Sequence, residues 1–103
     1  MAGTIEVSPG VPWSAASWLF DFVLRSIAAE VSDRELAGDL IGIQDENLGW
    51  LSLVDLREDE RAEVDRVVRD CLMARAERDL PGEVRNRAEA MAHICRLVAL
   101  LAP

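Results

Sequence analysis

The chain has 103 residues, of which half are hydrophobic and 29% are charged, a composition typical of one globular domain. Its formal net charge is -8 at pH 7, and all eleven basic residues are arginine. An acidic domain repels phosphate backbones and anionic lipid, so neither nucleic acid nor a membrane surface is an expected partner. No apolar run approaches the ~18 residues that cross a bilayer, and no basic segment leads into an apolar one at the N-terminus. We therefore expect a cytoplasmic protein without a signal peptide.

The first elements are a short strand and a helix. Thr4–Val7 favours an extended conformation, and Ser8-Pro9-Gly10 favours a turn. A helix is predicted from about Ser14, which can act as its N-cap, to Ala29. Its apolar stripe comprises Trp18, Leu19, Phe22, Val23 and Ile27, while Phe20 and Leu24 lie off the stripe. Since the helix is apolar on more than one face, we expect it to be central; the alternative is that one face receives a partner.

A second helix is predicted to start at Ser32, because Ser32-Asp33-Arg34-Glu35 has the form of a capping box. It should end near Asn47 or Gly49. Its apolar stripe comprises Leu36, Leu40 and Ile43. Gly38 and Gly42 lower the helix propensity, and their spacing suits the close approach of a neighbouring backbone; a frayed or broken helix is the alternative.

The middle of the chain is ambiguous before it becomes helical again. In Trp50–Leu56, the odd and the even positions are both mostly apolar, which does not fit a strand with one solvent-exposed face. The segment is therefore either a short buried strand paired with Thr4–Val7 or an apolar loop. A third helix is predicted over about Arg57 to Asp79, with Asp55 as its cap. Its opposite face is densely charged, which indicates a surface helix. The apolar stripe comprises Val64, Val67, Val68, Cys71 and Leu72.

The last helix is predicted from about Glu83 to Leu101, after Leu80-Pro81-Gly82 interrupts the third. Its seam comprises Val84, Ala88, Met91, Cys95 and Val98, and is widened by Ile94, Leu97, Leu100 and Leu101. Four helices with short connections predict a mainly α fold, a compact bundle with an optional small two-stranded edge. Residues 1–103 are expected to form a single helical domain.

The side chains that carry chemistry are few. His93 is the only histidine, and it lies two positions from Cys95, which on a helix points to another face. Cys71 and Cys95 are expected to be free thiols of a reducing compartment, although a disulfide stays open if their helices pack together. No phosphate loop, nucleophile elbow or zinc spacing occurs in the sequence, and the acidic turn from Asp45 fails the calcium-loop pattern. We expect no catalysis, no metal and no cofactor.

Two features suggest a partner-binding surface. Glu35, Asp39 and Glu46 fall on one side of the second helix and can form an acidic strip that attracts a basic partner. The alternative is an ordinary solvated face. Among the tryptophans, Trp18 is expected in the core, whereas Trp13 and Trp50 lie at predicted element edges and are candidate contact residues.

The sequence therefore favours a non-catalytic protein–protein interaction domain, an acidic binder such as an immunity protein, an antitoxin or an adaptor. Small size, acidity and the missing catalytic motifs support this hypothesis. A structural or regulatory homo-oligomer, for instance a homodimer joined through the first or the last helix, is the alternative. A small enzyme or ligand-binding bundle has only scattered carboxylates and His93 in its favour.

Overall fold

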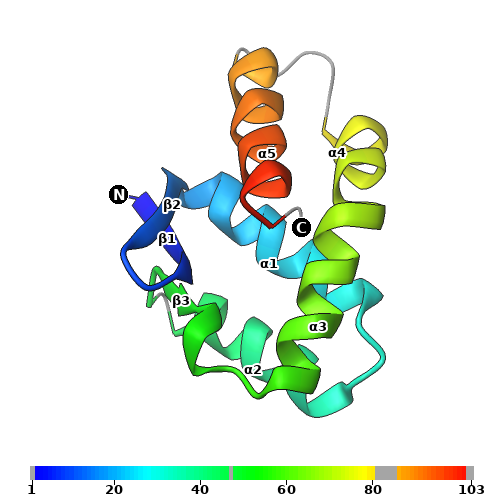
Figure 1. Cartoon of the computed structure of the whole chain (residues 1–103). Coiled ribbons are helices and arrows are strands. Elements are labelled where there is room, and N and C mark those ends of the chain that lie inside the picture. Colours follow the sequence, from blue (N-terminus) through cyan, green and yellow to red (C-terminus); the bar gives the residue numbers. More distant parts are fainter. Residues whose placement is uncertain (1, 47, 81–85, 102–103) are drawn as a thin grey trace.

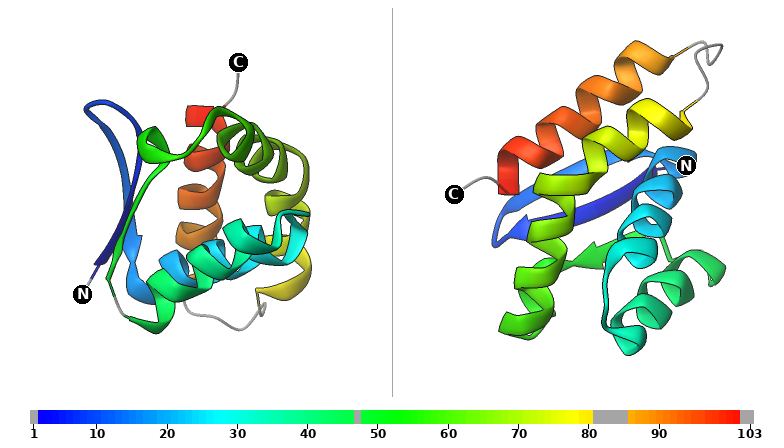
Figure 2. Two further views of the ribbon diagram at one scale, coloured as in Figure 1. Left: turned by 90° about the horizontal axis from the view of Figure 1, so that it is seen from below. Right: turned by 90° about the vertical axis from the view of Figure 1, so that its right-hand side faces the viewer.

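The computed structural model describes residues 2–46, 48–80 and 86–101, which fold into a small sheet and a larger helical layer (Figure 1). The strands are β1 (Ala2–Ser8), β2 (Val11–Ala16) and β3 (Trp50–Ser52). The helices are α1 (Ser17–Glu30), α2 (Arg34–Asp45), α3 (Glu58–Val67), η2 (Val68–Leu72), α4 (Met73–Asp79) and α5 (Arg87–Leu101), with one short 3₁₀ turn, η1 (Leu53–Asp55). The structure is mostly helical, as predicted. The helices cover one face of the sheet, and a simple bundle is not confirmed (Figure 2).

The sheet has three strands, so the predicted two-stranded edge is wrong. β1 lies in the middle, antiparallel to β2 and parallel to β3. The missed strand is β2, which follows a turn in which Gly10 has φ 78°. In β2, buried and exposed residues alternate, and Pro12 is tolerated there because an edge strand needs no ladder bond from that position. Trp50–Leu56 combines both sequence alternatives, a short strand followed by a 3₁₀ turn.

The first helix starts three residues later than predicted, because Ser14 belongs to β2 and Ala16 occupies the N-cap position. α1 is central, as expected, since it buries side chains on a broad face. The buried set comprises Leu19, Phe20, Val23, Leu24, Ser26 and Ile27. This face includes the two residues assigned off the stripe, and it excludes Trp18, which is 45% exposed. The expectation that Trp18 belongs to the core is therefore wrong.

Trp13 is a core residue, which contradicts its prediction as a contact residue. Its side chain is 1% exposed, and its indole N–H donates a hydrogen bond of 2.7 Å to the backbone carbonyl of His93. The strand places Trp13 on the inner face of the sheet, opposite Ile5 in the register. A large aromatic that satisfies its one donor in this way links β2 directly to α5.

The start of α2 differs from the predicted capping box. Asp33 is the capping residue, because its carboxylate accepts the N–H groups of Glu35 (3.0 Å) and Leu36 (3.1 Å). The hydroxyl of Ser32 instead contacts Glu63 on α3. A Cβ added at Gly38 or Gly42 would meet no atom within 4 Å, so within the described structure no backbone uses the predicted close approach.

The third predicted helix is observed as one continuous run, α3–η2–α4, from Glu58 to Asp79. Its first turn is closed by Glu60, whose carboxylate accepts the N–H of Arg57 at 3.0 Å, and not by the predicted Asp55. The predicted stripe is confirmed, with Cys71 partly buried at its edge and the other members buried: Val64, Val67, Val68 and Leu72. The run has a π-helical segment at Val68–Leu72 and packs there against both α1 and α5.

The last helix is described from Arg87 onward; Glu83 and Val84 lie outside the described residues. The residues predicted to widen the seam form most of its core face, since the buried residues are Ala90, Ile94, Leu97 and Leu101. The predicted seam itself lies at the edge of this face or outside it, because Met91 and Val98 are partly buried and Ala88 and Cys95 are exposed. Cys95 is exposed and Cys71 is partly buried, and both thiols are free. The two cysteines are therefore free, as expected, but Cys95 does not pack in the core, although the sequence places it on the apolar seam of this helix.

Candidate functional site

The three carboxylates of the predicted strip are exposed. Glu35 and Asp39 belong to α2, and the N–H of Glu46 still donates to the carbonyl of Gly42 at 3.0 Å, so helical geometry reaches this residue. Residues four and seven positions apart lie on one side of an α-helix, which places all three along one line. We call Glu35, Asp39 and Glu46 the acidic strip; it extends over roughly 16 Å of helix axis.

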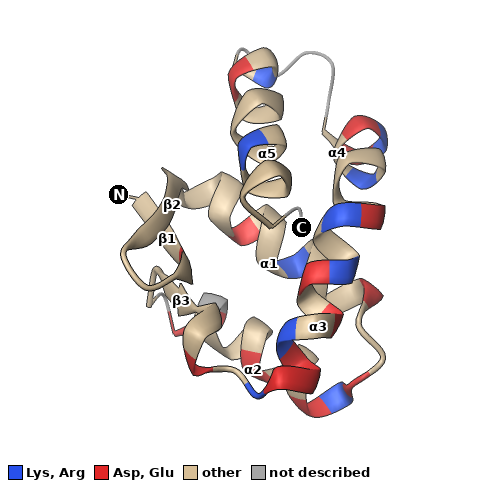
Figure 3. Ribbon diagram, in the orientation of Figure 1, with Lys and Arg blue, Asp and Glu red and all other residues tan. Residues whose placement is uncertain are grey.

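The acidic strip carries no ion pair in the part of the chain that the structure describes. Within the described ranges, none of its carboxylates lies within ion-pair distance of an arginine. On the α3–α4 side, acidic and basic residues alternate (Figure 3). The observed pairs there are Arg57 with Asp33, Asp59 and Glu60, Arg61 with Asp65, Arg75 with Glu30 and Asp79, and Arg78 with Asp79; Glu58, Asp70 and Glu77 have no ion pair among the described residues. The strip is thus acidic surface that the described structure leaves unneutralised.

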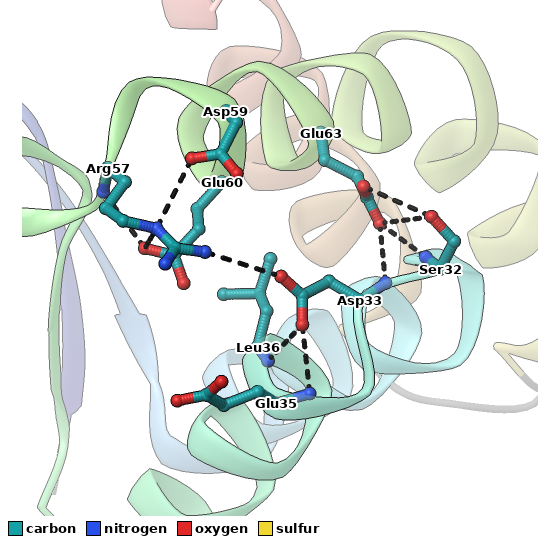
Figure 4. Close-up of polar contacts among 8 residues, drawn as sticks. All are labelled: Ser32, Asp33, Glu35, Leu36, Arg57, Asp59, Glu60 and Glu63. Carbon is teal, nitrogen blue, oxygen red and sulfur yellow. Dashed lines mark hydrogen bonds and ion pairs between the residues drawn. The ribbon is translucent and has the colours of Figure 1, made fainter.

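A polar network beside the strip has a structural role (Figure 4). The carboxylate of Glu63 accepts the N–H groups of Ser32 and Asp33, and Asp33 in turn caps α2 and lies 3.8 Å from Arg57. The N–H of Asp33 is the main cause that lowers the pKa of Glu63, with smaller contributions from Ser32 and Arg66, and desolvation opposes them. These contacts fix the start of α2 against α3 and so position the strip.

A wide groove of about 560 Å³ lies between α1 and α2. Its lining is mostly small: Ala28, Ala29, Ala37, Gly38 and Gly42, with Ile41 and the charged residues Arg25, Arg34 and Asp45. At 100° per residue, Gly38 and Gly42 lie on the side of this groove that faces the acidic strip. A chain segment seated in the groove would therefore reach the strip carboxylates across a surface without side chains.

The groove continues along α1 toward an apolar patch, which the sequence offered only as the alternative for this helix and without its residues. A depression of about 310 Å³ is lined by Trp18, Asp21, Phe22 and Arg25, and it shares Arg25 with the groove. Trp18 is 45% exposed, and Phe22 is partly buried. The signal was present in the sequence, because α1 has more large apolar residues than one buried face accommodates. The periodicity alone did not show which of them face outward.

Trp50 is exposed, as the interaction hypothesis requires, but it lies on another face. It pairs with Thr4 in the sheet, and its side chain is 49% exposed on the side away from the helices. Its neighbours on that face are polar: Thr4 hydrogen-bonds Ser14 at 3.0 Å, and Ser52 donates to Glu6 at 3.0 Å. The structure therefore places Trp50 apart from the α1–α2 groove.

The reactive side chains do not converge on a centre. The imidazole Nε2 of His93 lies 3.9 Å from Glu89 on the same helix, and its ring is partly exposed. Cys71 and Cys95 are free thiols on separate helices. In the part of the chain that the structure describes, no group of three His, Cys, Asp or Glu residues is placed to hold a metal ion.

Comparison with known proteins identified no relative. No family model, no curated protein and no solved structure matches the chain. Among the described helices, none is long and apolar enough to cross a membrane.

Proposed function

We propose that this chain is a non-catalytic protein-binding domain that docks a basic partner protein on the α1–α2 face. The observation that carries the proposal is the line of three unpaired carboxylates on α2. The carboxylates of Glu35, Asp39 and Glu46 are exposed, follow one another along one line of α2 and are unpaired among the described residues, whereas on the α3–η2–α4 run unpaired carboxylates are interspersed with carboxylates paired to arginines. Immunity proteins, antitoxins and adaptors are the classes that bind in this way without chemistry of their own.

The shape of the face supports an amphipathic helix of the partner as the bound element. Its apolar side would lie along the groove and on Trp18 and Phe22, and its basic side would face the acidic strip. Gly38 and Gly42 allow the partner backbone to come close, because added Cβ atoms there would meet nothing in this chain. The attraction is electrostatic and exposed, so we expect it to weaken strongly as the salt concentration rises.

The test is a capture experiment with two matched charge-reversal variants. The strip variant carries Glu35→Arg, Asp39→Arg and Glu46→Arg. The control variant carries the same number of reversals at the exposed carboxylates Glu58, Asp70 and Glu77, for which no ion pair is observed. Tagged wild type and both variants are incubated with native extract at low and high salt, and bound proteins are quantified by mass spectrometry.

The proposal requires that wild type and the control variant both retain one basic protein in a stoichiometric amount. The strip variant should not retain it, and high salt should release it from wild type. An equal loss of retention in the strip and control variants would show that net charge, and not the strip, governs binding, and wild-type retention by the strip variant would exclude the strip as the contact. Retention that high salt does not reduce would contradict the electrostatic mechanism.

A homodimer remains the second candidate because of the apolar surface on α1. Trp18 at 45% exposure and the adjoining Phe22 form a patch that a second copy could cover. Light scattering at increasing protein concentration measures this directly. A mass that stays at one chain, 11.4 kDa, at the highest concentration would exclude it.

A further inference from the structure

A small cavity lies where the start of α1 meets the first turns of α5. Its volume is about 90 Å³, and its polar and aromatic lining consists of Trp18, Asn86, Glu89 and His93. Pockets for small molecules are several times larger, about 300–1,000 Å³. A cavity of this size accommodates the end of one side chain.

The walls of the cavity are held in place by core contacts. Leu19 and Ala90, which line its base, are 2% exposed. The hydrogen bond from Trp13 to the carbonyl of His93 fixes α5 against the sheet at the same level. The site is therefore formed before anything enters it, and a ligand need not order these walls.

The chemistry of the lining selects a cation. Trp18 is 45% exposed and contributes an indole ring, and a tryptophan is the aromatic side chain that attracts cations best. Glu89 contributes a carboxylate from α5, and Asn86 contributes a side-chain amide whose oxygen can accept a hydrogen bond. An aromatic ring beside a carboxylate favours positive charge and disfavours an anion.

We propose that this cavity binds the guanidinium group of an arginine side chain, contributed by the basic partner inferred above. Arginine fits better than lysine because its planar head stacks on an aromatic face and donates two parallel hydrogen bonds to a carboxylate. The assignment of the arginine to a partner rests on the proposed function, whereas the affinity of the cavity for guanidinium does not.

A small probe tests the cavity without the partner. The full-length ¹⁵N-labelled chain is titrated with N-acetyl-arginine amide, the lysine analogue and the citrulline analogue, which is neutral but has nearly the shape of arginine. The readout is the NMR shift of the Trp18 indole N–H and of the Glu89 and His93 amides. Glu89→Gln and Trp18→Leu test the two contacts, and Glu58→Gln and Trp50→Leu are matched controls at other exposed sites.

We expect millimolar binding of the arginine probe, with the citrulline probe weaker by about threefold or more. Glu89→Gln should raise Kd by about threefold, the size of an exposed ion pair, and Trp18→Leu by about fivefold. The controls should leave Kd unchanged. Equal shifts with citrulline, lysine binding tighter than arginine, or losses in the controls matching those at Trp18 and Glu89 would overturn the assignment.

The strip variant separates this inference from the proposed function. Reversal of Glu35, Asp39 and Glu46 should leave the Kd of the arginine probe unchanged, since none of these residues lines the cavity. If the arginine probe binds but the strip variant still captures the partner, the strip is not the docking site and the cavity assignment stands. Failure of the probe together with strip-dependent capture would refute the cavity alone.

Discussion

The substitution Trp13→Phe tests the most consequential contact of the fold. Trp13 is among the largest fully buried side chains, and its N–H donates to the carbonyl of His93, 80 positions along the chain. Phenylalanine keeps an aromatic ring on the inner face of the sheet but removes this donor and the outer part of the larger, two-ring indole. The change therefore weakens the connection of β2 to α5 without altering the net charge.

The expected loss has two parts. Removing the hydrogen bond costs about 1 kcal/mol, because the carbonyl of His93 then loses a partner in a partly buried place. The missing ring atoms forfeit apolar burial and leave space, which costs roughly 1–2 kcal/mol. The free energy of unfolding should fall by about 2–3 kcal/mol, and for a chain of 103 residues Tm should fall by roughly 10–20 °C.

Urea unfolding followed by far-UV circular dichroism measures this difference. The matched control is Trp50→Phe, which makes the same chemical change at a side chain that is 49% exposed and should cost about 0.5 kcal/mol or less. If the two variants unfold at the same urea concentration, Trp13 is not the buried link between sheet and helix, and the argument from its hydrogen bond is wrong.

Three further outcomes follow from single positions, each with its own measurement. Gly3→Ala should lower the free energy of unfolding, measured in urea, by about 1–3 kcal/mol, because its Cβ would overlap the buried ring of Phe20. Gly38→Ala should raise it by about 0.5–1 kcal/mol, because alanine favours the helix and its Cβ would meet no atom. Changes of the opposite sign would contradict the packing at these two positions. The pKa of Glu63 is lowered in the fold, so its ionised form stabilises the chain above the usual carboxyl range, and this contribution disappears as the pH falls through the lowered pKa. In the Glu63→Gln variant, Tm should therefore decrease less than in wild type as the pH is lowered. If Tm depends on pH in the same way in both proteins, the contacts of Glu63 are not retained in solution. A maleimide should label Cys95 much faster than Cys71 in the native protein, and equal rates would contradict their different exposure.

The helical parts of the fold were largely predictable because hydrophobic periodicity reports a single buried face well. The run from Arg57 to Asp79 has one apolar stripe and one charged face, and its predicted ends agree with the structure within a residue. Its π-helical segment left no recognisable pattern in the sequence. The exposure of Glu35, Asp39 and Glu46 was likewise predictable, since charged residues at helical spacing rarely enter a core.

Hydrophobic periodicity did not predict which face is buried in helices that have two apolar faces. In α1, either Trp18 or Phe20 could have faced the core, and the sheet selected Phe20, which lies against Gly3 of β1. In α5, the face containing Ala90 and Ile94 was selected over the one containing Cys95. Such choices depend on what packs opposite, and a one-dimensional pattern does not contain that information.

The sequence by itself determined a mostly helical acidic chain, the extent of its longest helical run, and a line of carboxylates on α2. Only the tertiary structure decided that Val11–Ala16 is a strand, because its pairing with β1 joins residues whose local signals favoured a turn and a helix cap. It also exchanged the roles of Trp13 and Trp18, burying one and exposing the other. Burial of a side chain is a property of the neighbours that fold around it, and those neighbours come from distant parts of the chain.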